Sequence, residues 1–136
     1  MHNPMHPHGK VLRFEIPAAD LDRAQAFYSE VFSWHVQRVP AAGPAVYMAQ
    51  TVASDEHGRP HEPGAVNGEL RQRDETAAHP LIVIGVPDLE EYLRKAERAG
   101  GKVVLPAQRR GASLYARIAD PEGNIVALWE DHEQPA

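Results

Sequence analysis

Charged side chains repeat at two-residue spacing in the first strand that the sequence predicts. In residues 11–16, Arg13 and Glu15 alternate with apolar residues, and this period is typical of a half-buried strand. A guanidinium on that face must meet a carboxylate, supplied either by Glu69 or by a ligand. Without metal, Glu69 or Glu15 could act as a base while Arg13 stabilises developing negative charge.

Other sequence features exclude several kinds of site. The chain has no cysteine, which rules out disulfides, a zinc ribbon and a thiol nucleophile. His57 and His61 have a spacing that suits two ligands on one helix, but Gly58 and Pro60 argue against a helix there. Residues 1–10, which contain three other histidines, and residues 131–136 are expected to be disordered tails.

Composition narrows the class of protein. The 136 residues, 43% of them apolar, are enough for a single domain, expected over residues 11–130. A net charge of −5 argues against a nucleic-acid partner, because phosphate binding requires clustered Lys and Arg. The N-terminus does not resemble a signal peptide and no stretch is long enough for a membrane span, so we expect a cytoplasmic protein with no membrane partner.

The elements that must position these side chains occur twice. Residues 11–24 and residues 81–91 each read as an apolar strand, a proline and an Asp-Leu pair that opens an amphipathic helix. Asp20 and Asp88, which we expect to cap the two helices, are 68 residues apart. The pattern predicts two βαβββ repeats, over about 11–71 and 81–130. The further strands are expected at 35–39, 45–51, 65–71, 102–105, 114–119 and 124–130, with a break at 40–44 and a tight turn at 120–124.

The repeated openings, the Ala99-Gly-Gly-Lys-Val103 segment and the Asp120-Pro-Glu-Gly-Asn124 turn followed by Leu128-Trp129 resemble the vicinal oxygen chelate superfamily. That superfamily includes glyoxalase, bleomycin-resistance proteins and extradiol dioxygenases. The resemblance implies an α+β fold in which two βαβββ modules form an open, curled mixed β-sheet barrel with flanking helices. It also implies a homodimer.

Enzymes of this family usually hold a divalent metal with four inward-facing groups. The corresponding positions here are expected at Arg13, Glu69, Leu81 and Ala127. Arginine has no lone pair to offer a metal, and Leu and Ala side chains have no donor atom. We therefore expect no metal and no other cofactor at the usual place, unless ligands lie elsewhere.

The leading prediction is a small-molecule binding protein of the glyoxalase and bleomycin-resistance type. A metal-dependent lyase, isomerase or dioxygenase of the same superfamily is the alternative, and a non-catalytic subunit or partner-binding module is a third. A ligand cavity is expected to use polar side chains with a flat apolar wall. Its candidates are Arg13, Glu15, Asn67, Glu69, Arg71, Tyr47, Tyr115 and Trp129.

Overall fold

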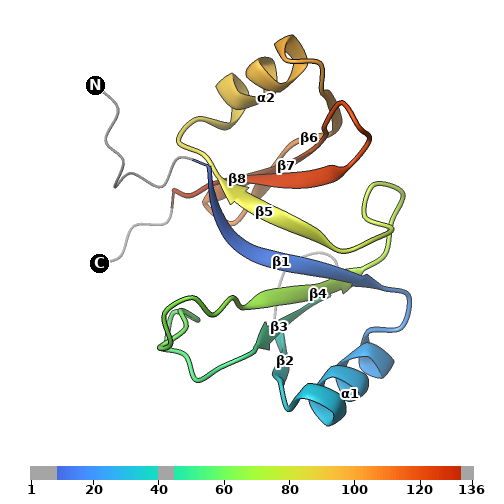
Figure 1. The fold of residues 1–136 in the computed structure, drawn as a ribbon, viewed down its shortest axis with the longest axis vertical. Coiled ribbons are helices and arrows are strands. Elements are labelled where there is room, and N and C mark those ends of the chain that lie inside the picture. The colour runs from blue at the N-terminus through green and yellow to red at the C-terminus, as the bar shows by residue number, and fades with distance from the viewer. Residues whose placement is uncertain (1–8, 40–44, 133–136) are drawn as a thin grey trace. The chain divides into compact units, whose positions relative to one another are not determined.

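The computed structural model describes residues 9–39 and 45–132. The predicted break at 40–44, the tail at 1–8 and residues 133–136 lie outside the described residues. The elements are β1 (Lys10–Ala18), α1 (Leu21–Phe32), β2 (His35–Val39), β3 (Val46–Gln50), β4 (Gly68–Gln72), β5 (Leu81–Gly85), α2 (Leu89–Arg98), β6 (Lys102–Arg110), β7 (Ser113–Ala119) and β8 (Ile125–Glu130). The order confirms the prediction of two βαβββ modules in the α+β class (Figure 1). The chain divides into a unit of residues 13–80 and a unit of residues 1–12 with 81–136.

The first unit is a four-stranded mixed sheet in the order β2-β3-β4-β1. β1 and β4 run parallel, whereas β3 runs antiparallel to both β2 and β4. The side chain of Asp20 accepts a hydrogen bond from the N–H of Arg23 at 3.0 Å and begins α1. α1 ends at Ser33, whose left-handed φ of 60° lets its N–H donate to the carbonyl of Ser29.

α1 covers one face of this sheet and buries an apolar core against it. The buried members of that core are Ala18, Leu21, Val36, Tyr47, Ala49 and Leu70. Trp34 extends the core toward the end of the helix, because its ring stacks on Tyr28 with centroids 5.0 Å apart. The opposite face of the sheet is therefore left for the charged residues of β1 and β4.

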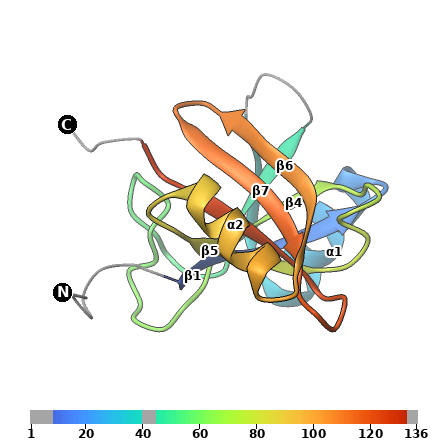
Figure 2. The same cartoon turned by 90° about the horizontal axis from the view of Figure 1, so that it is seen from above.

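The second unit repeats this arrangement with the strand order β5-β8-β7-β6, and α2 lies across one face of it (Figure 2). Its core consists of Val86, Leu89, Leu93, Ala116 and Leu128. β6 runs to Arg110, five residues beyond the end predicted from the sequence, and pairs with β7 through irregular register shifts after Val103 and Leu105. Those bulges break the two-residue alternation that would have revealed the longer strand.

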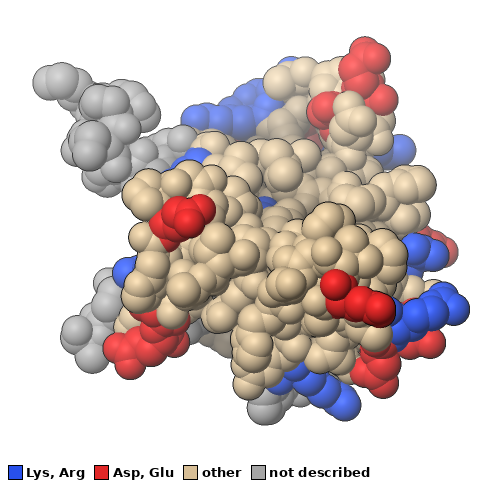
Figure 3. All heavy atoms as spheres, turned by 60° about the horizontal axis from the view of Figure 1, so that its bottom comes forward, with Lys and Arg blue, Asp and Glu red and all other residues tan. Residues whose placement is uncertain are grey.

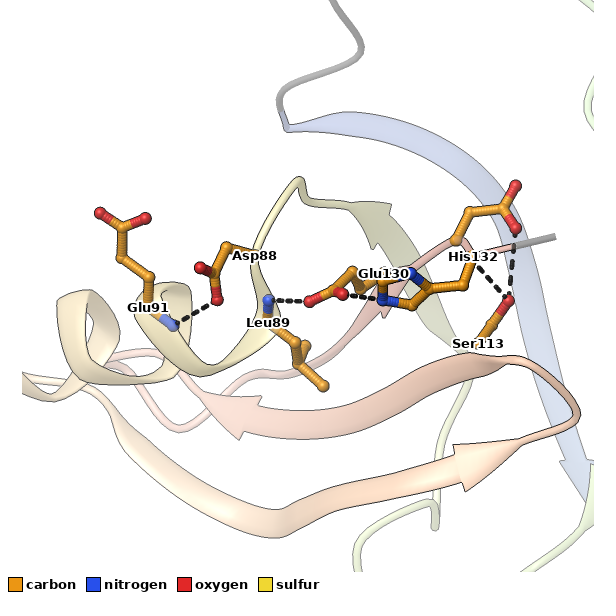
Figure 4. A network of polar contacts seen from close by, with 7 residues as sticks. Asp88, Leu89, Glu91, Ser113, Glu130 and His132 are labelled. Carbon is orange, nitrogen blue, oxygen red and sulfur yellow. Dashed lines mark hydrogen bonds and ion pairs between the residues drawn. The ribbon is translucent and has the colours of Figure 1, made fainter. Parts of the chain in front are cut away.

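The N-terminus of α2 has two caps (Figure 4). Asp88 accepts a hydrogen bond from the N–H of Glu91 at 3.1 Å, as predicted, and Glu130 at the end of β8 accepts one from the N–H of Leu89. The second carboxylate oxygen of Glu130 contacts the ring of His132. Glu130 thus connects the N-terminus of α2 to the C-terminal end of β8. Among the described residues, none of the helices is long and apolar enough to cross a membrane.

The turn at 120–124 depends on one carboxylate. Asp120 Oδ1 accepts the N–H groups of Glu122 and Asn124, and the N–H of Gly123, at a φ of 86°, donates to the Asp120 carbonyl. The hydrogen bond from the Asn124 N–H, with the smaller contributions of its side chain and of Glu122, lowers the pKa of Asp120 below 3.8.

A carboxyl whose pKa is depressed by folding stabilises the protein above its unfolded pKa, and that stability is lost as pH falls through the folded pKa. We therefore expect Asp120→Asn to reduce the free energy of unfolding at pH 7 and to change it little at about pH 2. Urea unfolding of both proteins at the two pH values checks this, with Asp131→Asn as the control. An equal loss at both pH values would contradict the assignment.

Candidate functional site

Two arginine–carboxylate pairs lie on the face of the first sheet that α1 does not cover. In the parallel register of β1 and β4, Glu15 is opposite Glu69, and Pro17 is opposite Arg71. Arg13 Nε lies 3.8 Å from Glu69 Oε2, and Arg71 Nη1 lies 3.4 Å from Glu15 Oε2. The predicted Arg13–Glu69 pair thus forms between neighbouring strands rather than across a barrel.

The two pairs differ in their access to solvent. The side chains of Glu15 and Arg71 are 3% and 10% exposed, whereas those of Glu69 and Arg13 are 17% and 20% exposed. The inner pair is therefore a desolvated structural element, because both of its charges are held away from water. The outer pair is wider than a hydrogen bond and is partly exposed, although Arg13 Nε itself is buried.

Asn67 has a structural role that the sequence did not reveal. Its side-chain oxygen accepts the N–H of Thr51 at 2.8 Å, and its amide nitrogen donates to Ser54 Oγ at 2.8 Å and to the Gly58 carbonyl at 3.1 Å. The side chain is buried and its hydrogen-bonding groups hold the 51–60 loop against β4. Asn67 therefore supports the sheet next to Glu69, and its amide is engaged by the loop.

Tyr47 lies on the opposite face of the sheet from Arg13. It pairs with Leu70 on β4, belongs to the core beneath α1, and donates its hydroxyl hydrogen to Asp22 of that helix. This hydrogen bond to a carboxylate is the main reason that the pKa of Tyr47 is raised above 10.0. The prediction that Tyr47 forms a cavity wall beside Arg13 is corrected by this placement.

The second unit has its own polar cluster on the sheet face away from α2. Leu81, Ala127 and Tyr115 are buried there, and Trp129 lies opposite Tyr115 in the β7–β8 register. Arg117, which the sequence analysis missed, is 2% exposed and its Nε donates to the Tyr115 hydroxyl at 2.9 Å. The two-residue spacing of Tyr115 and Arg117, which places both side chains on one face of a strand, is the sequence feature that could have predicted this contact.

Tyr115 does not offer a free aromatic wall either. Its ring is fully buried, with the Arg110 guanidinium carbon 4.4 Å from the ring centroid and Trp129 edge-on at 6.4 Å. Trp129 is only half-buried, so of the two predicted wall residues in this unit it is the accessible one.

The residues at the expected metal positions do not fit a divalent ion. Glu69 is the only one of the four with a ligand atom, and that carboxylate lies beside the Arg13 guanidinium. Leu81 and Ala127 are buried hydrocarbon. Within residues 9–39 and 45–132, no group of three His, Asp or Glu side chains has an arrangement that could hold a metal ion.

The comparisons with known proteins agree with this fold. Residues 10–128 match the family model described as Glyoxalase/Bleomycin resistance protein/Dioxygenase superfamily. A glyoxylase-like domain-containing protein of Didymella fabae is 32% identical over 125 residues, which cover 89% of this chain and 93% of the relative. The chain therefore belongs to the glyoxalase/bleomycin resistance protein/dioxygenase superfamily, as the sequence resemblance predicted.

Two further relatives carry enzyme names. A probable lactoylglutathione lyase of Vibrio parahaemolyticus is 26% identical over 135 residues, 94% of this chain and 95% of that protein. The crystal structure of methylmalonyl-CoA epimerase from Mycobacterium tuberculosis has a TM-score of 0.64 and 20% identity, and the match covers 97% of this chain and 95% of that one. At that identity the structural likeness concerns the fold.

Proposed function

We propose that this protein binds a small anionic molecule at the Arg13–Glu69 pair, without a metal at that position. The supporting observation is the partly exposed Arg13–Glu69 pair, whose Nε and Oε2 atoms lie 3.8 Å apart, on a face whose other pair is more deeply buried. Arginine presents a planar fork of N–H donors that fits a carboxylate or phosphate. The family relation supports a small-molecule ligand, and the named relatives suggest anionic thioesters as probes.

Each residue of the two pairs has a separate role in this proposal. Arg13 binds the anionic group, and Glu69 accepts a hydrogen bond from a hydroxyl or amide of the ligand. Glu15 and Arg71 neutralise each other behind them and fix the spacing of β1 and β4. If a reaction follows binding, Glu69 is the group placed to take a proton and Arg13 the group placed to stabilise the resulting anion.

The expected result is that Arg13→Met weakens ligand binding by at least about tenfold, because it removes a charge-assisted contact while keeping an apolar stem. Lactoylglutathione, methylmalonyl-CoA and a panel of short carboxylates are screened by thermal shift in excess EDTA. Arg38→Met is the matched control, because Arg38 lies opposite Tyr47 and so on the α1-facing side of the same sheet. Equal shifts for wild type and Arg13→Met, or a loss shared by Arg38→Met, would contradict the role of Arg13.

We also propose that the protein forms a homodimer. β2 is an edge strand of the first unit's sheet and β6 is an edge strand of the second unit's, and an edge strand exposes backbone N–H and C=O groups that another chain can cover. Sedimentation velocity at micromolar concentration is expected to give twice the 15.0 kDa chain mass. A single species at the mass of one chain would contradict this.

A further inference from the structure

An open depression of about 320 Å³ lies beside α1 in the first unit, mainly on the sheet face opposite to Arg13. We call it the α1 cavity. Its lining includes Ile16, Ala18, Arg23, Phe27, Tyr28 and Arg73. Ile16 and Ala18 come from the helix-facing side of β1, Arg73 follows β4, and the others lie on α1. Its volume is at the lower end of the range for small-molecule sites.

The charges around the α1 cavity favour an anion. Two basic residues, Arg23 and Arg73, belong to its lining along with a single acidic residue, Asp20. Asp20 already accepts the N–H of Arg23 as the cap of α1. Within the part of the chain that the structure describes, no ion pair engages either guanidinium. Both side chains are thus available to a carboxylate from solution.

The walls of the α1 cavity suit a flat apolar body. Phe27 is 54% exposed although it is a large hydrocarbon ring, and it meets Tyr28 edge-on with centroids 5.1 Å apart. Much of the face that Figure 3 brings forward carries neither acidic nor basic side chains. An exposed aromatic ring next to two arginines can bury its surface under a ligand that carries one negative charge.

From this juxtaposition we propose that the α1 cavity is a second ligand site, which takes a small aromatic carboxylate. The carboxylate pairs with Arg23 and Arg73, and the ring lies against Phe27 and Tyr28. The site is separate from the Arg13–Glu69 pair, because neither of those residues belongs to its lining and because Ile16 and Ala18, unlike Pro17, lie on the other side of β1. The two sites can therefore be tested independently.

The test titrates 2-naphthoate and its neutral analogue 2-naphthamide into the full-length protein and follows the backbone amide NMR signals. Naphthoate is expected to bind saturably with shifts centred on Ala18 and Ala24, and at least tenfold more tightly than the amide. Equal affinity for the two compounds would overturn the proposal, because an apolar surface alone, including one that contacts a second copy, does not discriminate by charge. Failure of naphthoate to saturate at millimolar concentration would overturn it as well.

Variants show which arginines contact naphthoate, and they distinguish the α1 cavity from the Arg13–Glu69 pair. Arg23→Met combined with Arg73→Met should weaken naphthoate binding at least tenfold and leave the naphthamide affinity unchanged. Arg38→Met and Arg13→Met should both retain naphthoate binding with the same shifted signals. Loss of these shifts in Arg13→Met would assign them to the Arg13–Glu69 pair and overturn the second site. The comparison of the two compounds on wild-type protein decides the question even if the double variant does not fold.

Discussion

Removal of either member of the Glu15–Arg71 pair is expected to destabilise the protein by about 3–5 kcal/mol, because it takes away a close counter-charge from a group that stays buried inside the sheet. Both side chains are at least nine-tenths buried and lie 3.4 Å apart. The surviving charge cannot recover its hydration, which is the main cost. Arg13→Ala and Glu69→Ala should each cost less, about 1–3 kcal/mol, since this pair is less deeply buried than the inner one.

Urea unfolding of Glu15→Ala, Arg71→Ala and the double variant Glu15→Leu with Arg71→Met measures these differences. The double variant should lose much less than the sum of the single losses, because it removes both charges together. The Arg13 and Glu69 variants are the matched controls on the same two strands. A loss below about 1 kcal/mol for Glu15→Ala would show that this pair is solvated and that the inner and outer pairs are not distinct.

Gly68→Ala is the second change with a large expected effect, because the Phe14 ring occupies the space that a side chain at Gly68 would need. A Cβ at Gly68 would lie 2.3 Å from the nearest atom of the Phe14 ring, well inside van der Waals contact. Relief requires the Phe14 ring to leave its position 5.5 Å from Trp34. We expect a loss of about 1–3 kcal/mol, together with a shift of Glu69 relative to Arg13.

The clash can be relieved in a second variant. Phe14→Leu in the Gly68→Ala background should recover part of the stability, whereas Phe14→Leu alone should be destabilising. Gly85→Ala is the control in the second module, where the nearest atom to a Cβ is a flexible Leu12 methyl group at 3.2 Å. Equal losses for the two glycine variants would contradict the close approach at Gly68.

Local patterns predicted the order of elements, the two helix caps and the 120–124 turn, because each depends on residues a few positions apart. They also placed Arg13 and Glu15 on one face of β1. The Glu15–Arg71 pair was not predicted as a contact, since it depends on the parallel register of strands 56 residues apart in sequence.

The face on which a residue lies was harder to predict in strands where apolar residues occupy both sets of alternating positions. In β3 the sequence does not tell whether Tyr47 or Met48 faces α1, and only the pairing of Tyr47 with Leu70 decides it. Asn67 was a candidate for ligand contact because the two-residue alternation of its predicted strand placed it on the same face as Glu69 and Arg71. Its role depends on the path of the 51–60 loop, which has no periodicity from which a fold could be predicted.

The Arg13–Glu69 pair is proposed to bind an anionic small molecule without metal, and a calorimetric titration tests this proposal. The compound with the largest thermal shift is titrated into untagged, chelator-treated protein, first in excess EDTA and then with Mn²⁺, Zn²⁺ or Ni²⁺ added. We expect the same dissociation constant in each condition and an affinity at least about tenfold weaker in Arg13→Met. Binding that appears only with metal, is abolished by Glu69→Gln and persists in Arg13→Met would contradict it.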